Sequence, residues 1–485
     1  MFTRLVRQLS FPEIIQREAR SDAESLSRSR YTLLGNPKRI RRILIHGAAF
    51  VITTDARNRV QVMPQRSVYI VNGVIKDVFP LRRKKIPAKN IDLLYDASKR
   101  GGIVVTPGFI NAHAHPPMYL LRSSMTLDKG NVVDQVAKMA KLEAQMSEQD
   151  FLLGAVGDFT EEQKFGITTT LSHYATFEPI EQAARLTKHN VINAVSAVSN
   201  SHPHNTPEYV EKILRKRRQY FTTPAIAIHY LHRATPAQLK KIKQLMRRYG
   251  VLLTMHCAET EAWVQQCVEK FGKRTVEALV DLGLAGPQVI LSHAVHVNDR
   301  EIELIRKYKI GVVHLPTSNK LHKSGEFDYP NFARHKAEQR LALGTDSVIS
   351  KNSLDLLSEA LHARIMHIDR YRVKYEDLFR MMTSQGAEVL QLKKVGKILP
   401  GFRADLCFWK LKDRGFLPYN EQKPLSLVGN MITHGGRNIR DLMINGEFII
   451  SNRLHNVINE SELLMELQRS HMALRNRPKK QVRRS

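Results

Sequence analysis

Short apolar runs alternate with stretches of helical apolar spacing through the middle of the chain. Eight runs have the length of buried parallel strands, and they lie in residues 101–113, 165–173, 190–199, 224–231, 250–259, 288–297, 310–318 and 340–346. Eight units of strand and helix predict an α/β fold, a (β/α)8 barrel of the TIM type. A doubly wound sheet is the alternative, but no GxGxxG follows the first strand. Polar residues gather at the carboxyl ends of many strands, which favours the barrel.

A different pattern flanks this region on both sides. Residues 42–55 and 66–80 are β-rich and interrupted by Gly and Asn, and a similar pattern returns at 404–411 and 440–450. We therefore expect a small β-sandwich domain built from residues 43–105 and 395–450, next to a barrel of residues 106–394. Residues 1–42 form an N-terminal extension with a short helix in this interpretation, and residues 451–485 form a basic C-terminal extension.

The composition is that of a globular protein. With 42% hydrophobic and 25% charged residues among 485, it excludes the disordered, collagen-like and coiled-coil classes. Three cysteines in so long a chain do not form a disulfide framework, and no apolar run approaches the roughly 20 residues of a membrane-spanning helix. We therefore expect a cytoplasmic protein, in a reducing compartment, without a membrane segment.

The net charge of +29 bears on the partners of the protein. Residues 1–42 hold ten Lys and Arg against four Asp and Glu, residues 469–485 hold seven against none, and the rest of the excess is spread along the body. Such a charge attracts nucleic acid, anionic membranes or acidic small molecules. The sequence has no zinc-finger spacing, RNP-like aromatic pattern or basic zipper, so we expect no dedicated nucleic-acid module. We expect a small-molecule substrate, and the basic body favours an anionic one.

Histidines and acidic residues stand at the ends of four predicted strands. His113 and His115 are two residues apart, so a strand places both side chains on the same face. Such a pair alone arises by chance, but strands five, six and eight end in His256, His293 and Asp346. The carboxyl ends of the strands form the active face of a barrel. Imidazoles and a carboxylate gathered there suit a divalent ion such as zinc or iron.

Seven motifs follow one another between about residue 42 and about residue 450: PGFINAHAHPPMYLLRS, GITTTLSH, MHCAET, SHAVHV, VVHLPTSN, LGTDSVISKNSLDLLSEA and VGKILPGFRADL. In order and approximate spacing they resemble the amidohydrolase superfamily. Within it, they resemble the deaminase and chlorohydrolase branch, which includes cytosine, guanine and S-adenosylhomocysteine deaminases and triazine hydrolases.

The resemblance implies roles for individual residues. It makes His113, His115, His256 and Asp346 metal ligands, and it makes Glu259, His293 and Asp346 catalytic proton-handling groups. Their chemistry agrees, because Asp346 and His293 can accept the proton of an activated water and Glu259 can donate one to a ring nitrogen. Binuclear members use a bridging carboxylated lysine at the end of strand four, and residues 225–233 contain no lysine. We therefore expect one divalent ion per chain, with zinc first and iron as the alternative.

Three further histidines are candidates for substrate binding. His229 matches a family histidine that touches the substrate, and His232 falls where the family often has a tyrosine, with a solvated loop position as the alternative. His173 ends the second strand, where it either faces the pocket or caps a helix. The family's deaminases commonly carry a tryptophan-bearing acidic stretch after the second ligand, whereas residues 123–130 contain no tryptophan. The substrate is therefore the least transferable feature of the resemblance.

The expected reaction is hydrolytic deamination of an amino-substituted nitrogen heterocycle, such as a purine, a pteridine or a nucleoside, by metal-activated water. Glu259 and His293 suit it because the reaction protonates a ring nitrogen and an amine leaving group. Two alternatives remain open: hydrolysis of another C–N or C–Cl bond, as in an amidine or a triazine, and a non-catalytic metalloprotein that binds through its basic surface. We expect a homo-oligomer, a dimer or higher.

Overall fold

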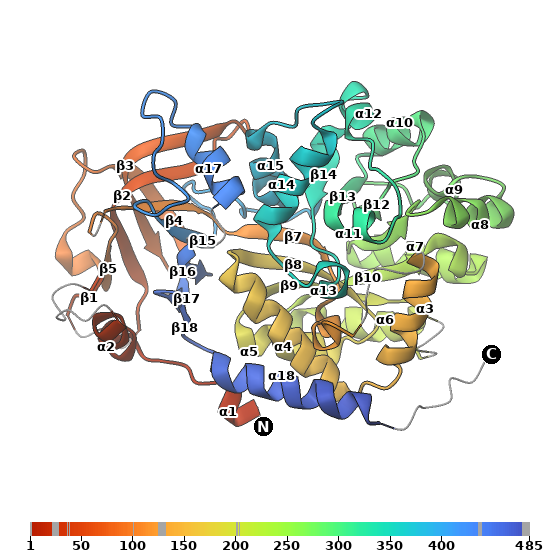
Figure 1. Ribbon diagram of the computed structural model, residues 1–485, viewed down its shortest axis with the longest axis horizontal. Coiled ribbons are helices and arrows are strands. Elements are labelled where there is room, and N and C mark those ends of the chain that lie inside the picture. The colour runs from red at the N-terminus through yellow and green to blue at the C-terminus, as the bar shows by residue number, and fades with distance from the viewer. Residues whose placement is uncertain are drawn as a thin grey trace.

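Two sheets organise the computed structural model, which describes residues 2–21, 29–35, 37, 39–99, 101–124, 132–199, 202, 204–434 and 439–477. An eight-stranded parallel sheet forms the barrel, and a ten-stranded sheet of mixed direction lies beside it, at the left of Figure 1. The predicted α/β barrel with a second β unit is confirmed.

All eight predicted barrel strands are present. They pair in chain order, each parallel to the next. The strands are β7 (Phe109–Ala114), β8 (Ile167–Tyr174), β9 (Asn190–Ser196), β10 (Thr223–Tyr230), β11 (Leu253–Cys257), β12 (Val289–His293), β13 (Gly311–His314) and β14 (Leu341–Leu343). Nearly all their residues are buried, because one face fills the barrel and the other packs under helices.

Helices follow each strand of the barrel. They are α3 (Val132–Glu143), α4 (Glu148–Lys164), α5 (Glu178–Thr187), α6 (Pro207–Arg215), α7 (Pro236–Tyr249), α8 (Glu261–Phe271), α9 (Thr275–Asp281), α10 (Asp299–Tyr308), α11 (Pro316–Leu321), α12 (Tyr329–Arg334), α13 (Val348–Lys351), α14 (Leu356–His367), α15 (Tyr375–Met382) and α16 (Ser384–Val389). Five of them begin where a Ser, Thr or Asn side chain accepts a hydrogen bond from the third helical amide. These caps are Ser147, Thr206, Thr235, Thr260 and Asn298.

The last strand closes onto the first at the end that carries the predicted site. The Asp346 amide donates to the His113 carbonyl at 3.0 Å, and Ala114 forms a parallel bridge with Asp346. Gly344 permits this approach, because a β-carbon there would lie 2.9 Å from the Leu315 side chain and 3.0 Å from the His113 backbone nitrogen. Barrel closure therefore places Asp346 directly beside the first histidine motif.

The second sheet joins both ends of the chain. Its strands are β1 (Tyr31–Leu33), β2 (Arg42–Thr54), β3 (Val60–Val71), β4 (Val74–Pro80), β5 (Leu93–Asp96), β6 (Ile103–Pro107), β15 (Leu406–Lys410), β16 (Ile439–Ile444), β17 (Glu447–Ser451) and β18 (Leu454–His455). β6 pairs antiparallel with β15, so the N-terminal and C-terminal strands meet directly. The first half of β2 pairs with β5 and its second half with β6. Its register with β3 shifts around Gly47, whose φ is +67°, and such a shift bends a strand.

The segment before residue 43 packs on this sheet. β1 pairs with β5, and Ile14 of α2 (Phe11–Ser21) is buried in the apolar core of the sheet. Glu18 of the same helix forms a buried ion pair with Arg440 of β16. The sequence predicts this helix but does not predict that it packs on the second sheet. The expected division of the chain into domains remains an interpretation.

The C-terminal helix α18 (Glu460–Arg475) crosses the outside of α4, with α1 (Phe2–Leu5) beside it, at the bottom of Figure 1. Leu474 is 3% exposed and shares an apolar cluster with Phe151 of α4. Arg477 forms an ion pair with Asp150 at the start of α4. The basic C-terminal segment is therefore folded onto the barrel as far as Arg477, which its charge pattern does not reveal. α17 (Ser426–His434) packs against α14 and α15.

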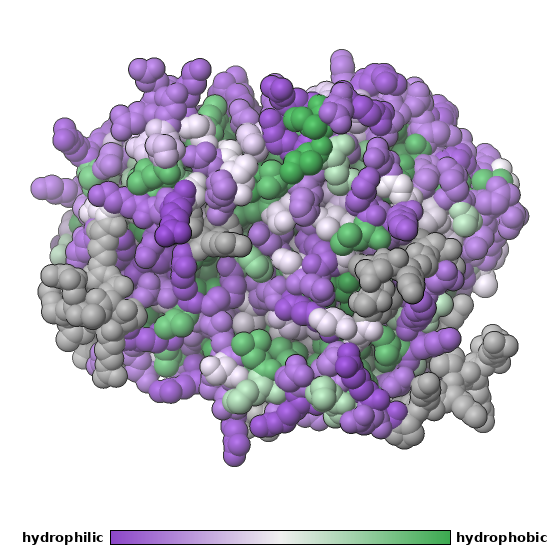
Figure 2. All heavy atoms as spheres, in the orientation of Figure 1, coloured by the Kyte–Doolittle hydropathy of each residue, from purple (hydrophilic) through white to green (hydrophobic). Residues whose placement is uncertain are grey.

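Hydrophilic residues cover most of the face shown in Figure 2, with small apolar groups among them. Exposed apolar side chains include Leu464, Met465 and Met472 on α18. Within the described ranges, no helix combines the length and the apolar character that a membrane crossing requires.

Replacing Leu474 with Ala should lower the free energy of unfolding by about 2–5 kcal/mol, because it leaves a cavity between α18 and the barrel. Met472→Ala is the matched control, since Met472 lies on the same helix and is 51% exposed. A chain that ends after residue 477 should melt like the full chain, and one that ends after residue 468 should melt at a lower temperature. Thermal denaturation checks both, and equal midpoints for the two truncations would show that residues 469–477, the last part of α18 and the residues after it, do not stabilise the fold.

Candidate active site

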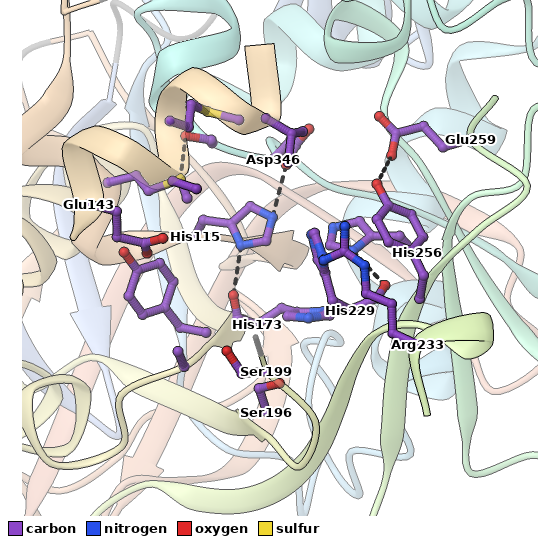
Figure 3. Close-up of a pocket in the computed structure, with 18 of the residues that line it drawn as sticks. His115, Glu143, His173, Ser196, Ser199, His229, Arg233, His256, Glu259 and Asp346 are labelled. Atoms are coloured by element: carbon purple, nitrogen blue, oxygen red, sulfur yellow. Dashed lines mark hydrogen bonds and ion pairs between the residues drawn. The ribbon is translucent and has the colours of Figure 1, made fainter. Parts of the chain in front are cut away.

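A cavity of about 420 Å³ lies at the carboxyl ends of the barrel strands (Figure 3). Val136, Met139 and Trp263 contribute to its apolar lining. Its ionisable lining comes from many elements of the barrel and comprises His115, Glu143, His173, Tyr174, His229, Tyr230, Arg233, His256, Glu259, His293, His322 and Asp346. A mixed cavity of this size, with polar groups that converge, suits a small-molecule ligand.

The four predicted metal ligands lie in two overlapping groups that share His113: His115 and Asp346 belong to one group and His256 to the other. His113 Nε2 lies 3.2 Å from His115 Nε2, and Asp346 Oδ1 lies 3.6 Å from the first nitrogen and 3.3 Å from the second. His256 of β11 joins them, with its ring centre 5.1 Å from that of His113. Barrel closure and the two-residue spacing of the histidines on β7 together produce this arrangement.

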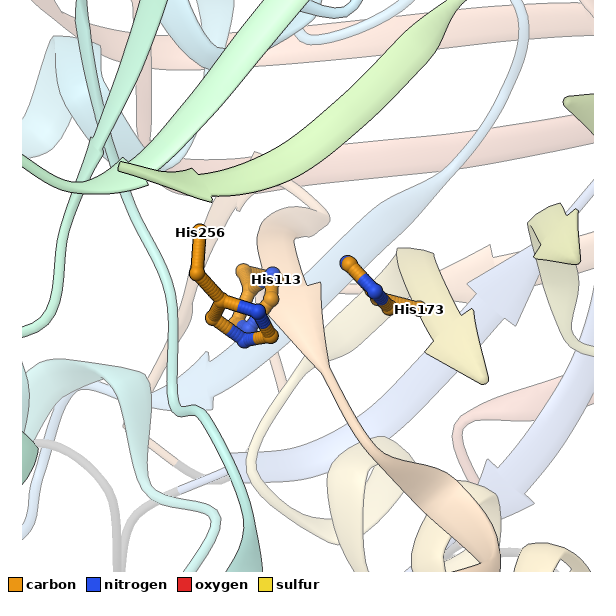
Figure 4. Close-up of side chains that lie close together, drawn as sticks. All are labelled: His113, His173 and His256. Atoms are coloured by element: carbon orange, nitrogen blue, oxygen red, sulfur yellow. The ribbon is translucent and has the colours of Figure 1, made fainter. Parts of the chain in front are cut away.

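His173 stands next to the same group. Figure 4 shows it beside His113 and His256, and the ligand atoms of these three residues lie within 4.8 Å of one another. Its Nδ1 atom is buried without a hydrogen-bond partner among the described residues. His173 therefore lines the cavity as predicted, but it lies closer to the metal-ligand group than its expected role in substrate binding implies.

Hydrogen bonds orient each of the three ligand imidazoles in the same way. The Nδ1 atoms pair with Ser292 Oγ at 2.8 Å for His113, with the carbonyl of His173 at 2.7 Å for His115, and with the carbonyl of His229 at 3.0 Å for His256. An Nδ1–H that donates to a carbonyl leaves Nε2 with a free lone pair. With a metal ion bound, these two hydrogen bonds to carbonyls would leave the Nε2 atoms of His115 and His256 free to coordinate it, which is the usual arrangement of metal-binding histidines.

Burial and charge set the protonation states of this group. Burial lowers the pKa of His113 to about 4, and burial together with the neighbouring histidines lowers the pKa of His256 well below its usual value. Burial would raise the pKa of Asp346, but hydrogen bonds from His113 and His115 outweigh it and hold the pKa of this carboxyl well below its usual range. Neutral imidazoles and an ionised carboxylate are the forms that bind a metal ion.

The geometry of the group fits a divalent ion. Zinc bonds of about 2.0–2.1 Å in tetrahedral geometry place neighbouring ligand atoms about 3.3 Å apart. The separations between His113, His115 and Asp346 are 3.2, 3.3 and 3.6 Å. The described residues that line the cavity include no lysine that could bridge a second ion.

Glu259 and His293 stand beside the ligand group as the resemblance implied. Glu259 Oε2 accepts a hydrogen bond from the Tyr230 hydroxyl at 2.9 Å and lies 3.6 Å from His293 Nε2. His293 Nδ1 pairs with Asn319 Oδ1 at 2.8 Å, so Nδ1 carries the proton and Nε2 faces Glu259 as an acceptor. Three residues of this region have a positive backbone φ, namely Ala258 at 45°, His293 at 72° and Asp346 at 60°. Non-glycine residues adopt such angles at an energetic cost, which is typical of functional sites.

The structure separates two of the predicted substrate-binding residues. His229 lines the cavity, whereas His232 is not among the described lining residues and stacks on the Tyr230 ring, 5.5 Å between centres. The register between β10 and β11 shifts between Ile228 and Tyr230, so simple alternation along β10 fails there. Both His229 and Tyr230 consequently reach the cavity.

Several cavity residues have no signal in the sequence. The positions of Tyr230 and Arg233 in the cavity depend on the irregular end of β10. The position of Glu143 depends on the packing of α3 against the cavity. Of residues 123–130, which depart from the family pattern, positions 125–130 lie outside the described residues. Trp263 of α8 supplies a tryptophan to the cavity from another part of the chain.

A (β/α)8 barrel with histidines and a carboxylate gathered at its strand ends is the arrangement of a hydrolase that uses a metal ion. The chain matches the family model described as the amidohydrolase family over residues 104–449, and it belongs to that family. The prediction from its motifs is confirmed.

Known proteins similar to this chain fall within the deaminase and chlorohydrolase branch. A 5-methylthioadenosine/S-adenosylhomocysteine deaminase from Syntrophomonas wolfei subsp. wolfei is 28% identical over 406 residues, which cover 81% of this chain and 91% of that protein. The structure of an adenosine deaminase from Xanthomonas campestris with bound zinc has a TM-score of 0.79 and 22% identity, and the match covers 91% of this chain and 100% of that one. An atrazine chlorohydrolase from Arthrobacter aurescens, complexed with zinc, has a TM-score of 0.78 and 19% identity, with 88% and 100% covered.

Ser292→Ala should weaken the affinity for a divalent ion by about 10- to 100-fold, because it removes the hydrogen bond that orients His113. Ser172→Ala is the matched control: Ser172 is also fully buried on a barrel strand, and its hydroxyl has no hydrogen-bond partner among the described residues. Titration against a competing chelator measures both affinities. Equal affinities in the two variants would mean that Ser292 does not position the ligand.

Proposed function

We propose that the protein is a metal-dependent aminohydrolase that releases ammonia from an amino-substituted nitrogen heterocycle, such as a purine, a pteridine or a nucleoside. The observation that carries the proposal is the pairing of Glu259 and His293, 3.6 Å apart, beside a group of buried metal-ligand side chains. A carboxyl group and an imidazole side by side at the edge of a cavity can donate and accept the protons of a hydrolytic reaction.

The proposal includes one divalent ion per chain, zinc first and iron as the alternative. His113, His115, His256 and Asp346 would hold it, and the lowered pKa values of His113, His256 and Asp346 and the short separations support this assignment. Burial would lower the pKa of His115, but the interaction with Asp346 outweighs burial and raises this pKa, so an ion would displace a proton there. An ion at this point lowers the pKa of a bound water from 15.7 towards about 7, so that hydroxide is available near neutral pH.

The residues of the chain then divide the proton transfers between them. His293, with Nε2 free to accept, and Asp346 take up the proton of the attacking water. Ser318 donates to the second oxygen of Asp346 and holds the carboxylate in place. Glu259, in its protonated form, donates to the ring nitrogen, which makes the neighbouring carbon electrophilic, and a proton delivered to the amine allows ammonia to leave. Tyr230 fixes the orientation of Glu259 through its hydroxyl.

The similar proteins support deamination and keep one alternative open. The deaminase relatives and the structurally similar adenosine deaminase favour an amine as the leaving group. The structural similarity to the atrazine chlorohydrolase favours the second candidate, hydrolysis of a C–Cl bond or of another C–N bond in the same site. Release of ammonia or of chloride from a panel of amino- and chloro-substituted purines, pteridines and triazines distinguishes the two. A panel that yields neither product would favour a non-catalytic metalloprotein.

Compartment and assembly are also part of the proposal. The three cysteines, Cys257, Cys267 and Cys407, are buried and free, which supports a reducing compartment such as the cytoplasm. Leu464, Met465 and Met472 are exposed on α18, which supports a homo-oligomer. Light scattering of the purified chain measures its assembly.

Glu259→Gln should keep the metal ion and lose turnover by roughly 10²- to 10⁴-fold, because the amide keeps the shape of the side chain but has no transferable proton. His256→Ala is the contrasting variant and should lose the ion, since it removes a ligand. Elemental analysis and ammonia release, measured on the same samples, separate the two roles. Loss of the ion in Glu259→Gln would make Glu259 a ligand, and near-full activity would contradict the deaminase mechanism.

A further inference from the structure

Arg233 is a cationic side chain in the wall of the cavity. It lies in the short helical turn Leu231–Arg233 after β10, and it is half-buried. Its Nη1 atom contacts His229 Nδ1 at 2.6 Å, and its guanidinium lies 5.1 Å from the centre of the Tyr230 ring. Figure 3 shows Arg233 reaching beside His229, on the side of the cavity where Ser196 and Ser199 also lie.

No acidic side chain among the described residues forms an ion pair with Arg233. Three other partly or fully buried arginines do have such partners: Arg274 pairs with Glu301, Arg403 with Asp405, and Arg440 with Glu18 and Asp441. A cation removed from water without a carboxylate is costly. Burial accordingly lowers the pKa of Arg233, and an interaction with Tyr230 opposes this effect.

The acids of the cavity are engaged elsewhere. Glu259 accepts from Tyr230, and Asp346 contacts the ligand histidines and Ser318. Glu143 interacts with Tyr174 on the wall formed by α3 and β8. Among the described residues, the Arg233 side chain makes a single hydrogen bond, to His229, so most of its five N–H donors remain for a ligand.

His229 fixes how far Arg233 stands from the metal-ligand group. The His229 carbonyl accepts from His256 Nδ1 at 3.0 Å, and the two imidazole centres lie 4.8 Å apart. The guanidinium is therefore one imidazole ring away from a metal ligand. A heterocycle whose reacting carbon lies at the ligand group would direct a substituent towards Arg233.

We propose that Arg233 binds an oxyanionic group, a carboxylate or a phosphate, on a substituent of the heterocyclic substrate. The inference rests on the proposed deamination and adds a specificity-determining residue to it. The planar fork of a guanidinium matches both oxyanions, which it binds through two parallel hydrogen bonds. The net charge of +29 assists, because a basic surface raises the encounter rate of anionic ligands.

The test uses two pairs of probes with the zinc-loaded full chain. Adenosine 5′-monophosphate and adenosine differ in a phosphate, and S-adenosylhomocysteine and 5′-methylthioadenosine differ in a group that carries a carboxylate. Steady-state kinetics give kcat/KM for each probe, and the selectivity is the ratio of the anionic to the neutral member. The pair that responds to substitution of Arg233 identifies the oxyanion.

Arg233→Met should lower the selectivity for one pair by about 10- to 100-fold, mostly through KM, because it removes charged hydrogen bonds to the substrate. Arg233→Lys should retain more of the selectivity, since it keeps the charge. Lys270→Met is the matched control: Lys270 is an exposed cation that contacts the His232 carbonyl, and it is not among the described residues that line the cavity. Its loss removes the same charge and should leave the selectivity unchanged.

Unchanged selectivity of Arg233→Met in both pairs would overturn the inference, and so would an equal effect of Lys270→Met. An equal loss for the anionic and neutral probes would make Arg233 a residue that only positions His229. If no probe releases ammonia, the proposed function fails for these substrates, and calorimetric binding of the same pairs to wild type and Arg233→Met still tests Arg233. If a neutral probe is deaminated but Arg233→Met has the same anionic-to-neutral selectivity as wild type, this inference fails and the proposed function stands.

Discussion

The structure depends on one interaction, the convergence of three imidazole nitrogens and a carboxylate where the barrel closes. His113 is fully buried, and His256 and Asp346 are 4% and 6% exposed. Polar groups removed from water in this way need compensation. The protein supplies part of it through hydrogen bonds between the Nδ1 atoms and Ser292 or two backbone carbonyls, and through the contacts of His113 and His115 with Asp346. In the proposed function, a divalent ion held by these residues would complete the compensation.

Much of the fold and of this group could be predicted from the sequence. The eight barrel strands are short apolar runs, and strand order follows chain order, so the ends of β7, β11, β12 and β14 had to meet. The spacing of His113 and His115 places both on one face of β7. These patterns are local or periodic, and the folded structure keeps the strand positions and strand faces that they predict.

The remaining features depend on irregular backbone and on long-range packing. The register shift after Ile228 brings Tyr230 and His229 into the cavity together, which strict alternation does not predict. Glu143 reaches the cavity from α3, more than 100 residues along the chain from Glu259, and no pattern links the two. Leu474 of α18 is buried and Met472 of the same helix is exposed. The basic residues around them gave no sign in the sequence that this helix packs on the barrel. Such contacts become visible only when the barrel is assembled.

Tyr230 links the proton-handling groups of the cavity to Arg233. Its hydroxyl donates to Glu259 at 2.9 Å, and the Arg233 guanidinium, whose donors pair with no acid of the described chain, lies 5.1 Å from the centre of its ring. A substrate of the proposed kind would have its amine at the ligand group and its anionic substituent at the guanidinium. His229, between them, contacts a metal ligand through its carbonyl and Arg233 through its ring.

The most direct test of the account is a zinc titration of the chelator-treated chain, followed by ammonia release from an amino-substituted heterocycle. The account predicts no release without metal and a linear rise that saturates at about one equivalent per chain, because His113, His115, His256 and Asp346 are proposed to hold a single ion. Full release from the metal-free chain, or saturation only at two equivalents, would contradict it.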